Sequence, residues 1–179
     1  MTMLIRTTGR NRRRGVVTVE MAFISILLFL FLFGIFEYCR LLFTLHLAEN
    51  AAHDAARFAA VHTGGGTMPG DPTTFTATDV TNVATYGTAQ GITYGTGMCG
   101  MQGNIQGYNV TAFTVDPVAL AATPTVVQAL SGSSWNSAAF SQNIAVQITG
   151  NYQPILPSLL FMNASVPFTV TVMFSSEGN

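Results

Sequence analysis

The chain has 179 residues, of which 49% are hydrophobic and only 8% are charged, a length that suits one domain plus a small accessory element. Soluble domains carry about 25% charged residues and disordered chains are poor in apolar residues, so this composition argues against a free cytoplasmic globule and against disorder. The formal net charge of −1 hides a division, because residues 1–15 carry five arginines and no acid, whereas residues 16–179 carry two arginines and eight acids.

An apolar segment follows the arginines at once. Val16 to Phe36 is 21 residues long, and at about 1.5 Å per residue it spans roughly 31 Å, the thickness of the hydrocarbon core of a bilayer. We therefore expect residues 1–15 to form a cytoplasmic basic leader and residues 16–38 to form a transmembrane helix. Because positive charge is retained on the cytoplasmic side, the rest of the chain is expected to be exported.

A cleaved secretory signal peptide would also place arginines before an apolar run. Its apolar core, however, is about 7 to 15 residues long and ends in small residues at the cleavage site. Here the run ends in Phe36, Glu37 and Tyr38. The same bulky residues precede Cys39 and disfavour a lipoprotein signal, so the sequence favours a membrane span.

Glu20 is an acidic residue inside the apolar segment. An ionised carboxylate in lipid costs on the order of 2.5 to 3.5 kcal/mol at the centre of a helix and less near the interface. Glu20 could lie among the headgroups, where an acid near a helix N-terminus is favourable. Alternatively, cleavage after Gly15 would let its carboxylate pair with the new α-amino group of a neighbouring subunit. Both interpretations stay open at this point.

Helical periodicity continues beyond the membrane segment and predicts an exported amphipathic helix over residues 39–62. Small or apolar residues recur at spacings of three and four on one face: Gly34, Tyr38, Leu41, Leu45, Ala48, Ala52, Ala55 and Ala59. A polar stripe on another face contains His46, Asn50, His53 and Arg57. Because alanines permit close approach of a neighbouring backbone, the first face is expected to pack on the rest of the chain or on other subunits.

Two candidate sites on this helix are disfavoured. His46, Glu49 and His53 lack the spacings of recognised metal ligands, and a solvent-facing polar stripe is the better account of them. Cys39 and Cys99 are the only cysteines, one at the membrane exit and one in a glycine-rich segment. Export would permit a disulfide between them, but their separation along the chain and the length of the helix disfavour an intrachain bond.

Residues 63–179 are expected to form a β-rich head. A glycine- and proline-rich loop over 63–72 ends the long helix, and a short helix is expected over 78–90. Residues 91–107 contain six glycines and are expected to form a loop. Alternating apolar residues predict three strands: 108–115, 143–152 and 165–174. The connections between them are expected to be a loop or short helix over 120–130 and a proline-bounded turn over 154–157.

The strand pattern indicates an antiparallel sheet with one apolar face, and the economical arrangement packs that face on the exported helix. The predicted fold class is therefore α+β, with a long N-terminal transmembrane helix that continues into an exported amphipathic helix packed on a small antiparallel β-sheet. The apolar run Leu159–Phe161 is too short to be a second membrane span.

The sequence contains no evident catalytic constellation. The three histidines lie in the predicted helix or at its end, and the charged residues beyond position 62 are Asp71, Asp79, Asp116 and Glu177. Four scattered acids without a basic partner do not supply acid–base chemistry, and a head without Lys or Arg cannot neutralise phosphates. We therefore expect no enzymatic activity, no cofactor, no metal and no nucleic-acid partner.

The N-terminal third resembles a known family. Arg12–Gly15, then Val16–Glu20 and a long apolar helix, resemble the class III leader of type IV pilin-like proteins, which a prepilin peptidase cuts after the glycine. The alanine-rich segment Glu49–Val61 is similar to that of TadE-like proteins, which are minor pilins or pseudopilins of tight-adherence (Flp) pilus systems. The resemblance is strongest over residues 10–61.

The resemblance implies a pilin-like fold and a structural role in pilus assembly. A single-pass precursor in the bacterial inner membrane would be cleaved between Gly15 and Val16, with Glu20 aiding the registration of subunits. The implied partners are the inner membrane, the prepilin peptidase, the major pilin, other minor pilins and the pilus assembly platform. The alternative hypothesis is an uncleaved single-pass anchor that presents an envelope-binding or adhesion module, and an exported enzyme ranks third.

Overall fold

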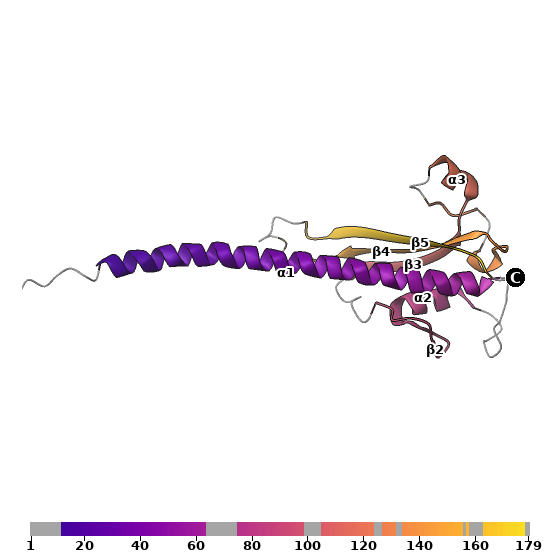
Figure 1. Ribbon diagram of the computed structural model, residues 1–179, viewed down its shortest axis with the longest axis horizontal. Coiled ribbons are helices and arrows are strands. Elements are labelled where there is room, and N and C mark those ends of the chain that lie inside the picture. The colour runs from indigo at the N-terminus through magenta and orange to yellow at the C-terminus, as the bar shows by residue number, and fades with distance from the viewer. Residues whose placement is uncertain are drawn as a thin grey trace, which may run out of the picture.

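The computed structural model describes residues 12–63, 75–98, 105–123, 127–131, 134–155, 157 and 163–177. It confirms the expected α+β class, because one long N-terminal helix runs along a small head that contains a second helix and an antiparallel sheet (Figure 1). Parts of the sequence analysis lie outside the described residues: the leader up to residue 11, the loop over 64–72, residues 99–104 with Cys99, residues 124–126, residue 156 and the run Leu159–Phe161.

Helix α1 (Arg12–Val61) is continuous over 50 residues, which corresponds to about 75 Å. Its N-terminal half extends away from the head, whereas its C-terminal half packs on it (Figure 1). The helix begins at Arg12, ahead of the expected start at Val16, so that Gly15 is helical. Apolar periodicity could not reveal this first turn, because it is built from arginines, which are good helix formers.

The head contains a three-stranded antiparallel sheet in the order β3-β4-β5. Its strands are β3 (Ile105–Thr114), β4 (Asn143–Tyr152) and β5 (Val166–Ser175). Strand β4 has the expected bounds and β5 is displaced by one residue. Strand β3, in contrast, begins inside the segment that was expected to be a loop. Gly107 adopts a positive φ of 63° at a shift in register, and this bulge interrupts the alternation from which strands are predicted.

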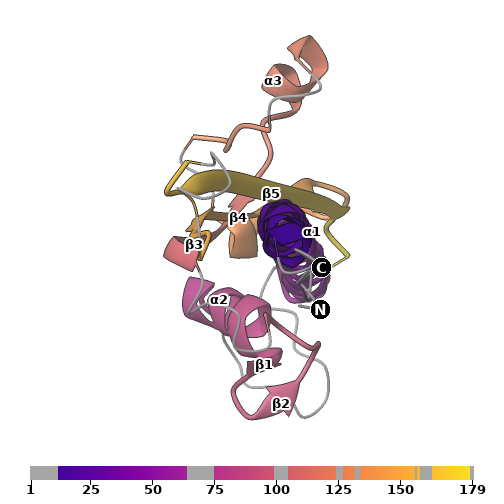
Figure 2. The ribbon, with the colours of Figure 1, turned by 90° about the vertical axis from the view of Figure 1, so that its left-hand side faces the viewer.

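Helix α2 (Ala77–Tyr86) packs against both α1 and β3 (Figure 2). It begins one residue before the expected start, because Thr76 and not a later residue is the cap. The backbone N–H and the hydroxyl of Thr76 both donate to Asp79 Oδ2, over 2.8 and 2.9 Å. Together with the hydrogen bond of 3.0 Å from the Asp79 N–H to the carbonyl oxygen of Thr76, these bonds fix the first turn of the helix.

The expected helix over residues 78–90 is too long at its C-terminal end. Gly87 has a φ of 73° and its N–H donates to the carbonyl oxygen of Val83 over 2.9 Å, which ends the helix in a left-handed cap. The chain then turns back as a short hairpin of β1 (Thr88–Ala89) and β2 (Ile92–Thr93).

Between β3 and β4 the described residues include two short helical segments. Helix α3 (Pro117–Ala122) begins earlier than the expected loop or short helix, because the side chain of Asp116 accepts a hydrogen bond of 2.9 Å from the N–H of Val118. The 3-10 helix η3 (Trp135–Ser137) carries the only tryptophan of the chain, which is 2% exposed.

The hydrophobic core lies where α1 meets the sheet and α2 (Figure 2). Strand β4 contributes Ile144, Val146 and Ile148, which are fully buried, as the alternation predicted. Helix α1 contributes a face of alanines that are all 0% exposed: Ala48, Ala51, Ala52, Ala55, Ala56 and Ala59. Because these side chains are short, the helix can approach both the sheet and α2 closely. The expected packing of the helix on the apolar face of the sheet is confirmed.

Candidate functional site

Between Val16 and Phe36, α1 carries apolar side chains on all sides, with Glu20 as its one charged residue. Large side chains such as Phe23 and Phe31 are 70% and 71% exposed. The most apolar window of the helix has a mean hydropathy of 2.6, and none of that window is buried within the molecule. The core helix of a soluble protein would be covered by other elements, so this helix fits a single-pass membrane anchor.

The residues expected to serve processing and assembly lie along this exposed segment. Val16 is 60% exposed, and a Cβ atom added to Gly15 would have no heavy atom within 4 Å. Glu20 is also exposed, and it forms no ion pair or hydrogen bond with any residue that the structure describes. All three belong to the N-terminal half of α1, and this half extends away from the head (Figure 1).

Helix α1 is joined to the sheet where its exposed segment ends. Glu37 is 7% exposed, and its Oε1 accepts hydrogen bonds from the hydroxyl of Tyr152 (2.6 Å) and from the N–H of Ile155 (3.2 Å). Arg40 donates from Nε to the Tyr152 hydroxyl oxygen (2.8 Å) and from a terminal nitrogen to the carbonyl oxygen of Gln153 (3.0 Å). We call Glu37, Arg40 and Tyr152 the helix–sheet clamp.

The electrostatics of the clamp favour a neutral phenol. Burial, and then the hydrogen bond to Glu37, raise the pKa of Tyr152 from 10 to about 12, against the opposing effect of Arg40. The hydroxyl can therefore donate to Glu37 while it accepts from Arg40. The guanidinium and the carboxylate are also 3.9 Å apart, so each charge of the clamp has a partner. Such an arrangement holds two elements together and leaves no group poised for chemistry.

The other end of α1 is fixed by the residues that follow β5. The hydroxyls of Thr63 and Ser176 are both buried and share a hydrogen bond of 2.6 Å. The N–H of Glu177 donates to the carbonyl oxygen of Ala60 over 2.9 Å, which satisfies one of the last carbonyl groups of the helix. The sheet is thus attached to α1 at two points, one near each end of β5, and this couples the head to the exposed segment mechanically.

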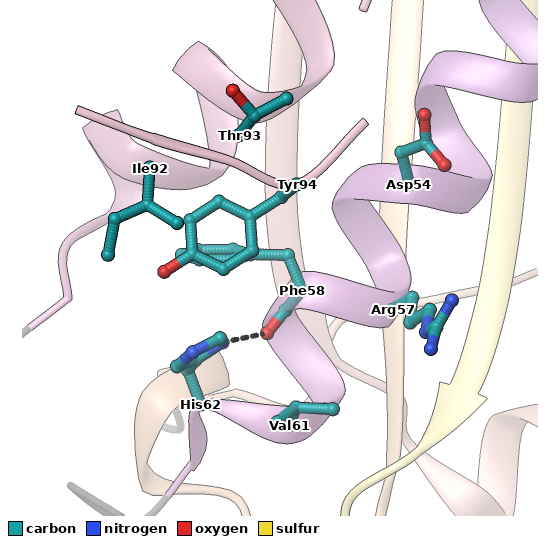
Figure 3. Close-up of a pocket in the computed structure, with 8 residues that line it drawn as sticks. All are labelled: Asp54, Arg57, Phe58, Val61, His62, Ile92, Thr93 and Tyr94. Atoms are coloured by element: carbon teal, nitrogen blue, oxygen red, sulfur yellow. Dashed lines mark hydrogen bonds between the residues drawn. The ribbon is translucent and has the colours of Figure 1, made fainter. Parts of the chain in front are cut away.

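A pocket of about 350 Å³ lies between the C-terminal end of α1 and the β1–β2 hairpin (Figure 3). Phe58, His62 and Tyr94 form an aromatic cluster there, with ring centroids 4.4 to 5.6 Å apart. Arg57 lies at the rim and points away from these rings (Figure 3). Asp54 Oδ2 accepts a hydrogen bond of 3.2 Å from the backbone N–H of Thr96, which follows the hairpin. The titratable groups do not converge on one point, so the pocket offers no acid–base pair.

The polar stripe of α1 faces outward as expected, with His46, Glu49, Asn50, His53 and Arg57 all exposed. His46 Nδ1 lies 3.3 Å from Glu49 Oε2. Among the described residues, no group of three or more His, Cys, Asp or Glu side chains is arranged to hold a metal ion. Cys39 is exposed and forms no disulfide within the described chain. Because Cys99 lies outside it, the expectation about their pairing stays a prediction.

Sequence reasoning missed the helix–sheet clamp. It placed Tyr38 on the packed face, yet Tyr38 is 59% exposed, and the buried positions are Glu37 (7%) and Thr44 (0%). The error arises because exposed positions near a membrane are apolar too, so apolar character does not identify the packed face. A signal was present in Glu37 and Arg40, two opposite charges three residues apart at the end of an apolar run.

These features define a class of protein, namely an α+β head attached to one long helix whose first half fits a membrane span. A family model described as TadE-like protein matches residues 15–57. The match confirms the resemblance to TadE-like proteins over the exposed segment and most of the packed segment of α1. No curated protein matches the chain, and no solved structure matches it.

Proposed function

We propose that this protein is a minor pilin or pseudopilin that takes part in the assembly of a tight-adherence (Flp) pilus, with a structural and not an enzymatic role. The observation that supports this most directly is the TadE-like match over residues 15–57, which coincides with the exposed apolar segment and the alanine face of α1. The first half of the helix is not covered by other elements, and its second half is packed on the head. The first half can therefore exchange contacts with lipid for contacts with other helices during assembly.

In this proposal a prepilin peptidase cuts between Gly15 and Val16, after the arginine-rich leader has kept the N-terminus in the cytoplasm. The bond directly follows the first turn of α1, whose backbone N–H groups lack acceptors within the helix. Unwinding of such a terminal turn costs little, because few helical hydrogen bonds are lost there. The open space around Gly15 leaves room for the peptidase.

After cleavage, Glu20 would be the one charged side chain between Val16 and Phe36. Its carboxylate is exposed and has no ion pair within the described chain. An unpaired charge in lipid is costly, so pairing with the new α-amino group on Val16 of a neighbouring subunit would favour assembly. The proposed partners are the major pilin, other minor pilins and the assembly platform of the bacterial inner membrane.

The N-terminal residue of the membrane-extracted protein tests the proposal. We expect Val16 to be the first residue in cells with an active prepilin peptidase, and an uncut chain in otherwise identical cells whose peptidase is inactivated. Mass spectrometry of the N-terminal peptide distinguishes the two forms. An intact Met1 or Thr2 in the presence of active peptidase would contradict the proposal and favour an uncleaved single-pass anchor with an envelope-binding or adhesion head.

A further inference from the structure

The residues that directly follow β4, Gln153 to Ile155, lie beside α1 at the point where the exposed helix reaches the head. Strand β4 ends at Tyr152, which pairs with Val166, the first residue of β5. The Tyr152 hydroxyl and the Ile155 N–H both donate to Glu37, so this end of the sheet is held at the level of Glu37. Helix α3 lies at the other end of the head, far from the N-terminal half of α1 (Figure 1).

This level coincides with the expected outer surface of the bilayer. Val16–Phe36 spans about 31 Å at 1.5 Å per residue, which matches a hydrocarbon core of about 30 Å. Glu37 is the next residue, so the helix–sheet clamp and Ile155 would lie at the boundary between hydrocarbon and headgroups. This step rests on α1 spanning the membrane, as in the proposed function, but not on cleavage or on pilus assembly.

At this level the charges face inward and apolar side chains face outward. The side chains of Glu37 and Arg40 are only 8% and 24% exposed, because both are engaged by Tyr152. The outward-facing side chains, which we call the collar, are 41% to 66% exposed: Phe36, Tyr38, Leu42, Phe43 and Ile155. Exposed apolar surface is unfavourable in water, whereas Leu, Ile and Phe are favoured in the hydrocarbon and Tyr is enriched at the membrane–water interface.

The composition of the chain around Ile155 supports the same conclusion. No charged residue occurs between Asp116 and Glu177. Residues 154–162 read PILPSLLFM, in which Ser158 is the only polar residue. Connections on a water-exposed surface are usually rich in polar turn residues. An uncharged, apolar stretch of this composition is instead suited to contact with lipid.

We propose that the collar rests at the boundary between the headgroups and the acyl chains of the outer leaflet. The head then lies against the membrane before assembly, and does not project from it on a free length of helix. Because Ile155 belongs to the head and the other collar residues belong to α1, the lipid contact is shared between the two. Removal of the protein from the bilayer would require both to be separated from lipid.

Quenching of tryptophan fluorescence by brominated phosphatidylcholine tests this contact, because bromine quenches only at short range. The full chain is reconstituted in vesicles of brominated or ordinary phosphatidylcholine, with Ile155→Trp as the test variant. Phe29→Trp, in the middle of the span, is the positive control. Val118→Trp is the matched negative control, because Val118 is 76% exposed on α3 at the far end of the head. The native Trp135 is buried and provides the baseline in the unsubstituted protein.

We expect brominated lipid to reduce the added fluorescence of Ile155→Trp strongly, that of Phe29→Trp at least as much, and that of Val118→Trp not at all. Quenching of Phe29→Trp without quenching of Ile155→Trp would overturn the lipid contact and leave the membrane span intact. Loss of quenching at Phe29→Trp would contradict the span, and with it the proposed function. An unquenched Ile155→Trp whose emission shifts to the blue with rising protein density would assign the collar to a second copy of the chain and overturn the lipid contact.

Discussion

The helix–sheet clamp gives partners to two charged side chains that lie at the end of an apolar segment. Charged side chains at the end of an apolar segment need water or a polar partner. For Glu37 and Arg40 this partner is the hydroxyl of Tyr152, which donates to Glu37 and accepts from Arg40. A buried polar group that loses its partner costs about 1 to 3 kcal/mol, which is more than a typical complete hydrogen bond contributes. The three side chains are therefore expected to act as a unit.

Tyr152→Phe is expected to lower the free energy of unfolding by about 1 to 3 kcal/mol, because the Glu37 carboxylate loses its strongest donor. Denaturant unfolding in detergent micelles, followed by the fluorescence of Trp135, measures the change. Tyr86→Phe is the matched control, since Tyr86 is 68% exposed and its variant should stay within about 0.5 kcal/mol of the wild type. Equal effects of the two substitutions would contradict a role for the Tyr152 hydroxyl.

The raised pKa of Tyr152 gives this contact a pH dependence. The fold favours the neutral phenol, with a pKa of about 12 against the ordinary 10. The contribution to stability is therefore complete below pH 10 and is lost as the pH rises through 12. Over this range the wild type should lose more stability than Tyr152→Phe, measured by the same unfolding assay. A difference between the two proteins that does not change with pH would contradict the assignment.

At the scale of elements, α1 is one helix with two kinds of surface, one apolar on all sides and one that packs through alanines. Its periodicity, the bounds of β4 and most of β5 were predictable, because they depend on residues close together in the sequence. The start of β3 and the end of α2 were not. Gly107 and Gly87 adopt positive φ angles at those points, and the spacing of apolar residues does not show where a single residue adopts a positive φ.

Ala52→Leu is expected to lower the free energy of unfolding by about 1 to 3 kcal/mol, because it forces a larger side chain between α1 and the elements that cover it. Ala52 is 0% exposed. Ala121→Leu, at an exposed position of α3, is the control and should change stability by no more than about 0.5 kcal/mol. Thermal unfolding of both variants in micelles compares them. If Ala52→Leu is as stable as the control, the alanine face is not closely packed.

At the scale of the whole molecule, the head is tied to α1 near both ends of β5, through the clamp and through the Thr63–Ser176 hydrogen bond. A displacement of the exposed segment must therefore move the sheet as well. Under the proposed function, this coupling would carry the head along when the helix leaves the bilayer for an assembly of neighbouring helices. The exposed segment itself has one acid, Glu20, with which to recognise a neighbour.

Glu20→Ala is expected to leave insertion into the membrane intact and to prevent assembly, because the carboxylate that would pair with a neighbouring N-terminus is gone. Fractionation of membranes measures insertion, and pilus counts together with co-isolation of the major pilin measure assembly. Glu20→Asp is the control, since it keeps the charge and should retain at least part of the assembly. Normal piliation with Glu20→Ala would contradict the pairing.

The sequence by itself determined the length of the span, the alanine face of α1 and the alternation of β4, because each depends on spacing within a few residues. Glu20 was singled out by its charge within the apolar segment and the cleavage after Gly15 was implied by resemblance, and the structure adds that both residues are exposed. Only the tertiary structure decided which face of α1 is buried where the exposed apolar segment ends. Glu37 and Tyr152 are 115 positions apart, so their contact depends on how the sheet packs on the helix. That packing turns the charges of the clamp inward and leaves the collar apolar.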